Sequence, residues 1–266
     1  MNRLYTFSLL GLTAAIPLSF ASTVSAEVTI TDFGYSGTVT GTSGGFNVYG
    51  AADAEIETIT VGTTVYSEFV APTTANTTDA PEDRYRPLAQ SGDGPFVGTP
   101  GSDLIGNRPT FGWSNGTAAT SSVDLLFGQT IFDNDAATDD VYELFLFELS
   151  GGDEFELTAI LGGTAEAPIL GRSAILDTFA VNSSDYIAAE RETGSDLATI
   201  RLGGSAFDIS DTFGVSELIG VRIAVNNAST LGGDPAVLLA SVPEPGSLIL
   251  LAAGGALVLC RKRRLA

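Results

Sequence analysis

The fold class is decided by residues 141–161, VYELFLFELSGGDEFELTAIL. Two runs rich in apolar and aromatic residues, 141–149 and 154–161, flank a turn-forming segment at 150–153, and this pattern predicts a β-hairpin. In the second run, Glu154, Glu156 and Thr158 alternate with apolar residues. Strict alternation indicates a strand with one face in the core and one in water. The predicted core face carries Phe155, Leu157, Ala159 and Leu161.

Similar strand signals extend in both directions from this hairpin. We expect hairpins about Gly34 and about Gly62, and a short helix only around residues 186–192. The regular spacing of short strands and turns predicts an all-β fold, an antiparallel, jelly-roll-like β-sandwich formed by residues 27–241. The further strands are predicted at residues 27–33, 35–40, 46–49, 54–61, 64–70, 122–132, 169–177, 179–182, 198–202, 206–209, 218–226 and 236–241.

Residues 71–121 interrupt the strand pattern. This segment contains six of the 11 prolines and the only tryptophan, Trp113. Proline removes a backbone donor and restricts the residue before it, which disfavours central strands. We therefore expect a long irregular loop here, of the kind that is often functional.

The composition excludes several kinds of chemistry. The 266 residues include no histidine, and the only cysteine and lysine, Cys260 and Lys262, lie in the last seven residues. The body therefore has no Ser-His-Asp or Cys-His catalytic site, no thiolate or imidazole zinc site, no P-loop lysine and no disulfide.

The net charge of the body points to cations rather than anions as partners. Residues 27–241 contain seven arginines and 31 carboxylates, a net charge near −24. Such a surface repels nucleic acids, so binding of nucleic acid is excluded. The charge suits either saline surroundings, where salt screens self-repulsion, or specific calcium binding.

The N-terminus has the features of a secretory signal peptide. Arg3 precedes a mostly apolar stretch at residues 4–20, and small residues lead up to Ala26. This order of charge, apolar run and small-residue site predicts cleavage after Ala26 and export of the mature chain.

The C-terminus has three parts in close succession. Pro243, Glu244 and Pro245 precede a short apolar run at residues 248–260. The apolar run favours lipid but is short for a bilayer span, and the positive charges after it favour the cytoplasmic side. The basic cluster comprises Arg261, Lys262, Arg263 and Arg264.

Residues 242–266 resemble the PEP-CTERM sorting signal of exosortase-dependent bacterial surface proteins. The resemblance implies that a membrane transpeptidase of the exosortase type recognises Pro243, Glu244 and Pro245 and removes the helix and the basic tail. It also implies transient anchoring in the inner membrane of a Gram-negative bacterium that makes extracellular polysaccharide, followed by display on the cell surface or in the matrix. The body lies outside the resemblance.

One candidate ligand site is an acidic loop at residues 133–140. Asp133, Asp135, Asp139 and Asp140 crowd carboxylates into a turn between two strands, and such oxygens are the ligands of calcium. The spacing does not match an EF-hand, which leaves a solvated turn without metal as the alternative.

A second candidate site lies in the segment 71–121. Arg84, Tyr85 and Trp113 could bind a sugar of an extracellular polysaccharide, since sugar rings stack on aromatics and sugar hydroxyls bond to planar polar groups. Alternatively, the aromatics cover a sheet edge and the arginines pair with neighbouring carboxylates.

Paired carboxylates are the one acid–base chemistry that the composition leaves open. Glu143, Glu148, Glu154 and Glu156 lie on the two strands of the expected hairpin, where a glycoside hydrolase could use two of them. The same residues fit a solvated sheet face. We therefore expect a protein that is not an enzyme and has a structural or adhesive role. The alternatives are a carbohydrate- or calcium-binding module and a carboxylate-dependent glycoside hydrolase.

Overall fold

The strand β12 (Leu144–Leu149) lies in the middle of the fold. The computed structural model describes residues 27–50, 54–77, 83–87, 113–114, 121–133, 141–149, 152, 154–181, 185–191, 197–225 and 235–242. Within these residues the chain is almost entirely β-strand, with one short helix, α1 (Ile209–Phe213). The all-β class is confirmed, and the jelly-roll order stays a prediction.

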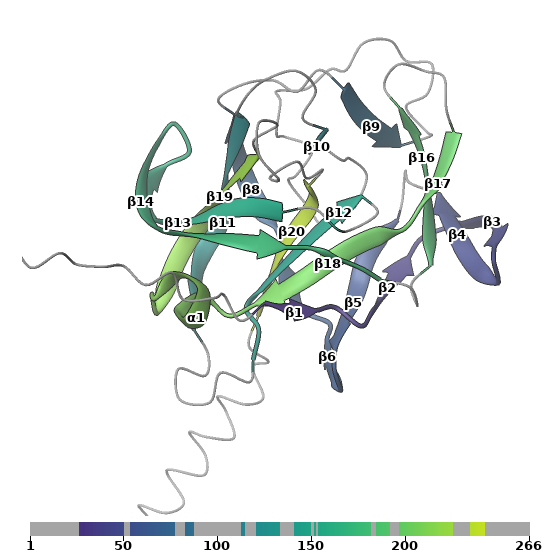
Figure 1. Cartoon of the computed structure of the whole chain (residues 1–266), viewed down its shortest axis with the longest axis horizontal. Coiled ribbons are helices and arrows are strands. Elements are labelled where there is room, and N and C mark those ends of the chain that lie inside the picture. The colour runs from purple at the N-terminus through teal and green to yellow at the C-terminus, as the bar shows by residue number, and fades with distance from the viewer. Residues whose placement is uncertain are drawn as a thin grey trace, which may run out of the picture.

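The remaining elements are strands, most of them short (Figure 1). They are β1 (Val28–Thr29), β2 (Asp32–Ser36), β3 (Val39–Ser43), β4 (Phe46–Gly50), β5 (Glu55–Val61), β6 (Thr64–Tyr66), β7 (Phe69–Val70), β8 (Pro72–Thr77), β9 (Asp83–Pro87), β10 (Trp113–Ser114), β11 (Ser121–Phe132), β13 (Glu154–Thr164), β14 (Ala167–Asp177), β15 (Phe179–Ala180), β16 (Tyr186–Arg191), β17 (Leu197–Ile200), β18 (Leu202–Phe207), β19 (Glu217–Val225) and β20 (Pro235–Ser241).

The strands form four sheets in the described part of the chain. The central sheet has the order β1-β18-β12-β20-β7, with β15 beside β18, and a second sheet has the order β14-β13-β19-β11-β8. A small sheet, β2-β5-β6, and a peripheral sheet, β10-β9-β16-β4-β3 with β17 beside β16, complete the fold. The pairing is antiparallel except between β4 and β16.

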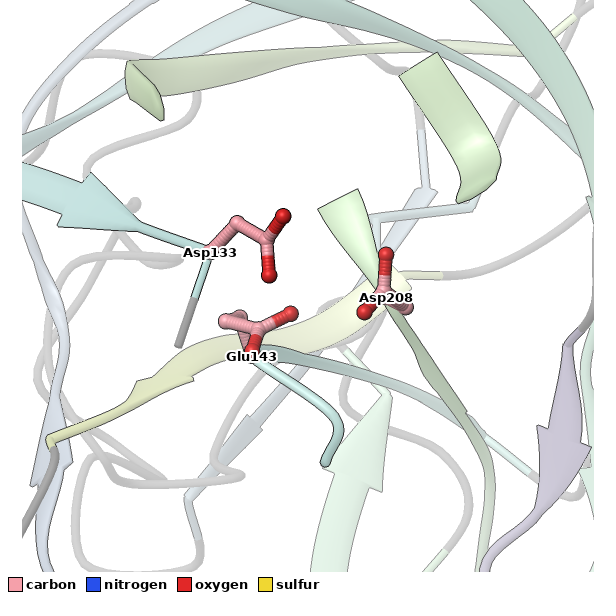
Figure 2. A group of neighbouring side chains, drawn as sticks. All are labelled: Asp133, Glu143 and Asp208. Atoms are coloured by element: carbon pink, nitrogen blue, oxygen red, sulfur yellow. The ribbon is translucent and has the colours of Figure 1, made fainter. Parts of the chain in front are cut away.

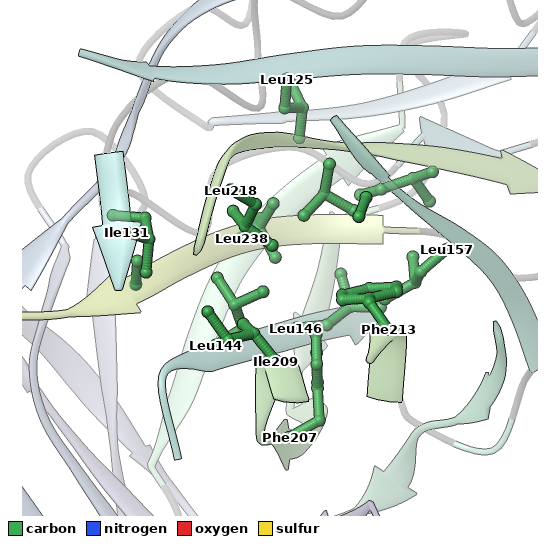
Figure 3. Packing of buried hydrophobic residues seen from close by; sticks show 14 of the residues in the cluster. Leu125, Ile131, Leu144, Leu146, Leu157, Phe207, Ile209, Phe213, Leu218 and Leu238 are labelled. Carbon is green, nitrogen blue, oxygen red and sulfur yellow. The ribbon is translucent and has the colours of Figure 1, made fainter. Parts of the chain in front are cut away.

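The central sheet is covered on both faces, because successive residues of β12 belong to two different cores. Leu144 and Leu146 pack into a first core with side chains from β11, β13, β19 and α1 (Figure 3). Phe145 and Phe147 pack into a second core with side chains from β2 and β5. All four side chains are buried, and each contributes roughly 1.5–3 kcal/mol through the apolar area removed from water. Figure 1 accordingly shows β12, β18 and β20 between β11 and β19 on one side and β2 and β5 on the other.

The predicted hairpin of residues 141–161 is wrong. β12 pairs with β18 and β20, whereas β13 pairs with β14 and β19 in the second sheet. A strand that is apolar on both faces belongs inside a covered sheet, where neighbours occupy both of its edges. The strands β12 and β13 therefore lie in two different sheets and are not paired with each other.

The alternation in β13 is confirmed on its core face as far as Ala159, whereas Thr158, predicted to face water, is 7% exposed. Phe155, Leu157 and Ala159 are fully buried, but Ile160 is also buried and Leu161 is 43% exposed. The register with β14 shifts on both sides of Ile160, and such a bulge reverses which face the following side chains take.

Other local predictions had mixed outcomes. The hairpin through Gly62 is confirmed, since β5 pairs with β6 and Gly62 has a φ of +60°. The hairpin about Gly34 is wrong, because Gly34 lies within β2, which pairs with β5. The helix predicted at residues 186–192 is the strand β16, whereas α1 was not predicted. The segment 71–121 is not wholly irregular, because it contains β8, β9 and β10.

Candidate functional site

Three carboxylates from distant parts of the sequence converge in the fold. Asp133 directly follows β11, Glu143 directly precedes β12, and Asp208 lies between β18 and α1. One oxygen from each lies within 4.8 Å of the others, and the three carboxyl groups face one another (Figure 2).

Strand register explains the convergence. Leu144 of β12 pairs with Phe207 of β18 in antiparallel register. Glu143, which precedes Leu144, and Asp208, which follows Phe207, therefore come to the same end of the central sheet. The backbone N–H of Asp133 donates to the carbonyl of Ser216 at 3.0 Å, which holds the end of β11 against the segment before β19. The second sheet thus supplies one carboxylate and the central sheet supplies two.

Asp208 also begins the helix α1. Its Oδ1 accepts hydrogen bonds from the backbone N–H groups of Ser210 at 2.6 Å and Asp211 at 2.8 Å, and from the Ser210 hydroxyl at 2.8 Å. This is a helix N-cap, which satisfies backbone donors that have no partner within the helix. Gly214, in the left-handed conformation, ends the helix after two turns at most.

The cluster is shielded from water. Glu143 and Asp208 are 0% and 1% exposed, and Asp133 is half-buried. The Oε2 atom of Glu143 accepts a long hydrogen bond of 3.4 Å from the backbone N–H of Ile209. The Oδ2 atom of Asp208 is buried and accepts no hydrogen bond within the part of the chain that the structure describes. Buried oxygens in this arrangement can hold a hard cation, but a substrate cannot reach them.

Of the four aspartates of the predicted calcium loop, Asp133 belongs to the carboxylate cluster. Asp135, Asp139 and Asp140 lie outside the described residues. The sequence analysis missed Asp208 altogether. A usable signal was the segment from Asp208 to Gly214, since an aspartate before a helical turn and a glycine after it are typical helix caps.

The predicted sugar-binding residues lie in the peripheral sheet. Arg84 of β9 is the register partner of Trp113 of β10, and Tyr85 is the partner of Arg191 of β16. Arg84 and Trp113, two of the three predicted residues, therefore lie opposite each other on paired strands. Sugar binding there stays a prediction.

The strand pairing behind the alternative of a catalytic carboxylate pair is not present. Glu143 directly precedes β12 and Glu148 lies within it, and both are 0% exposed, whereas Glu154 and Glu156 lie on β13 in the second sheet. Because β12 and β13 are not paired, the cross-strand spacing on which the hypothesis depended does not exist.

The last described residues are held firmly to the body. The backbone N–H of Ser241 donates to the carbonyl of Glu143 at 2.8 Å, and that of Val242 donates to the carbonyl of Glu68 at 3.0 Å. The Ser241 hydroxyl donates to the carbonyl of Tyr142 at 3.1 Å. The folded body therefore continues to the residue before Pro243.

The segment that begins at this point has a known counterpart. Residues 241–264 match the PEP-CTERM protein-sorting motif. The resemblance inferred from Pro243, Glu244 and Pro245 is confirmed, and the match indicates an exported protein that is sorted by an exosortase. Pro243–Pro245, the apolar run 248–260 and the basic residues 261–264 lie outside the described residues, as does the predicted cleavage site at Ala26. No helix among the described residues is long and apolar enough to span a membrane.

The body has weaker counterparts. No curated protein matches the chain. A solved structure of the CBM32-1 and CBM32-2 domains of Clostridium perfringens ZmpB shares 12% identity with 66% of the chain, at a TM-score of 0.31. The chain spans 37% of that structure. A similarity this low supports no conclusion about fold or ligand.

Proposed function

We propose that the chain is a surface or extracellular-matrix protein of a Gram-negative bacterium, with a non-catalytic structural or adhesive role. After export and removal of residues 1–26, residues 242–266 would anchor the body in the inner membrane until an exosortase processes it. The observation that carries the proposal is the position of the sorting motif. It starts at Ser241, the last residue of β20, so the whole described body lies on the exported side of the motif.

The positions of the four glutamates considered for catalysis support the non-catalytic part of the proposal. A glycoside hydrolase needs two carboxyl groups that reach the substrate from opposite sides of the scissile bond. Glu143 and Glu148 are fully buried, and the accessible glutamates of β13 belong to another sheet. The body also contains no histidine, cysteine or lysine for other acid–base or nucleophilic chemistry.

The sorting part is tested by replacing Pro243, Glu244 and Pro245 together with alanine in the producing organism. We expect the variant to remain unprocessed in the membrane, whereas the wild-type chain reaches the surface or the medium. Ser247→Ala, two residues after Pro245, is the matched control and should be processed normally. Normal surface display of the triple variant would refute the sorting mechanism.

The non-catalytic part is tested with polysaccharide from the producing organism. The purified protein should release no reducing sugar, measured alongside co-sedimentation with the polysaccharide. Release of sugar would overturn the proposal in favour of a hydrolase. Co-sedimentation without release would be consistent with an adhesive role, and its dependence on Trp113 would test the predicted sugar site.

A further inference from the structure

Three carboxyl groups converge at the end of β11, and those of Glu143 and Asp208 are buried. We propose that Asp133, Glu143 and Asp208 bind a single Ca²⁺ ion, which ties the central sheet to the second sheet at the edge of the first core.

The first argument is the concentration of negative charge. Three carboxylate oxygens lie within 4.8 Å of one another, and two of the residues are almost completely buried. Like charges at this separation repel, and burial removes the water that would screen them. Buried charges in proteins are paired or coordinate metals. A divalent cation at the centre would compensate most of the charge.

The second argument is independent of the charge and comes from one atom. The two oxygens of Asp208 have different environments: Oδ1 accepts three hydrogen bonds, and Oδ2 accepts none from the described residues although it is buried. The carboxyl group that carries Oδ2 faces Asp133 and Glu143 (Figure 2). A buried acceptor without a donor is costly to leave unsatisfied, and a cation between the three carboxylates would satisfy it.

The ligand set indicates the kind of ion. All three ligands are oxygens, and the body has no histidine or cysteine, which favours a hard cation over zinc or copper. Carboxylate oxygens that lie within 4.8 Å of one another can share one Ca²⁺ ion, whose Ca–O distances are about 2.3–2.6 Å. Ca²⁺ also tolerates an irregular set of ligands, whereas Mg²⁺ demands a nearly ideal octahedron.

The position of the site indicates a structural role for the ion. Asp133 ends a strand of the second sheet, while Glu143 and Asp208 flank paired strands of the central sheet. Ile131 and Leu144, close to these residues in the sequence, belong to the first core between the two sheets (Figure 3). The ion would thus close one end of the first core and would fix the start of α1 through Asp208.

The experiment measures Ca²⁺ binding to the purified full-length chain after treatment with a chelator. Equilibrium dialysis should show one saturable Ca²⁺ ion per chain, at free concentrations up to the millimolar region typical of extracellular modules. The melting temperature should rise by about 5–10 °C when Ca²⁺ exceeds its dissociation constant by about 100-fold. Mg²⁺ at the same concentration should have a smaller effect.

Two variants separate the site from the general acidity of the surface. Asp208→Asn removes the charge but keeps a side-chain oxygen that can still cap α1, and it should weaken Ca²⁺ binding by about tenfold or more. Asp211→Asn is the matched control, because it removes an exposed carboxylate from the same helix. It should bind Ca²⁺ like the wild type.

Several outcomes would overturn the proposal. One is that the wild type binds no Ca²⁺ in a saturable way, or binds only many Ca²⁺ ions weakly. Another is that Asp208→Asn and Asp211→Asn bind Ca²⁺ with equal affinity. If Asp208→Asn does not fold, Glu143→Gln replaces it, since glutamine keeps an acceptor for the N–H of Ile209. Stabilisation by Mg²⁺ equal to that by Ca²⁺ would refute the assignment of calcium.

Discussion

The ion pair between Asp124 and Arg222 should respond very differently to the loss of each partner. The two residues are directly opposite on β11 and β19. The guanidinium donates from Nε to Oδ1 at 2.6 Å and from Nη2 to Oδ2 at 2.9 Å. This hydrogen bonding raises the pKa of Arg222, so the guanidinium stays charged at any ordinary pH. The side chain of Asp124 is 3% exposed, whereas that of Arg222 is 26% exposed.

The difference in exposure sets the magnitudes. Arg222→Met leaves a carboxylate buried without its counterion, which costs about 3–5 kcal/mol of unfolding free energy. Asp124→Asn leaves a guanidinium that can extend its head toward water, so we expect a loss of about 1.5–3 kcal/mol. For a body of this size, the melting temperature should fall by roughly 6–20 °C in the first case and roughly 3–12 °C in the second.

The assay is urea unfolding of the two single variants and of the double variant Asp124→Leu/Arg222→Met. The double variant should be more stable than Arg222→Met alone, because it leaves no buried charge behind. Arg172→Met, on the exposed part of β14, controls for the loss of an arginine and should change stability by less than about 0.5 kcal/mol. A larger loss in Asp124→Asn than in Arg222→Met would refute the reasoning from burial, as would a double variant less stable than Arg222→Met.

Three further predictions concern the backbone, the pH dependence and processing. Gly220→Ala should cost about 3 kcal/mol in urea unfolding, because its Cβ would overlap the carbonyl oxygen of Leu125; a loss under about 1 kcal/mol would contradict this close approach. Burial raises the pKa of Glu27, whose carboxylate accepts a hydrogen bond from the N–H of Asp177 at 2.9 Å. The native state therefore loses stability as the pH rises from about 4.5 through the raised pKa. Glu27→Gln should be more stable than the wild type at pH 7 and no more stable at pH 4, and equal differences at both pH values would contradict the shift. Mass spectrometry of the exported chain should show cleavage after Ala26, and a chain that still begins at residue 1 would contradict the signal peptide.

The positions of the strands in the sequence were more predictable than the pairing between them. The alternation in β13 correctly placed Phe155 and Leu157 in a core, since a period of two depends only on local sequence. The pairing of β12 could not be inferred in the same way. Its apolar residues point to both faces of the sheet. This pattern fits a central strand that is covered on both faces, but it does not exclude a strand of a hairpin. The turn-forming sequence at residues 150–153 favoured the hairpin, although such a sequence can equally join strands of two different sheets.

The candidate site was less predictable, because it depends on register. Asp133 was identified from its acidic neighbours, but Glu143 and Asp208 join it only because Leu144 pairs with Phe207, 63 positions further along the chain. Nothing in the local sequence of either strand specifies that partner. From the sequence, Glu143 fitted either a solvated sheet face or one half of a catalytic pair, since a glutamate in a strand is usually exposed.

The proposed ion and the sorting motif meet at the same end of the body. The carbonyl of Glu143 accepts the hydrogen bond from Ser241, whose strand leads directly into Pro243. An ion that fixes Glu143 would therefore also fix the start of the segment on which the exosortase acts. The ion would therefore stabilise the end of β20 that leads into the sorting motif. The two proposals remain separable, because alanine at Pro243, Glu244 and Pro245 leaves all three carboxylates in place. That variant should bind Ca²⁺ like the wild type while it stays in the membrane, whereas Asp208→Asn should lose the ion and keep the motif.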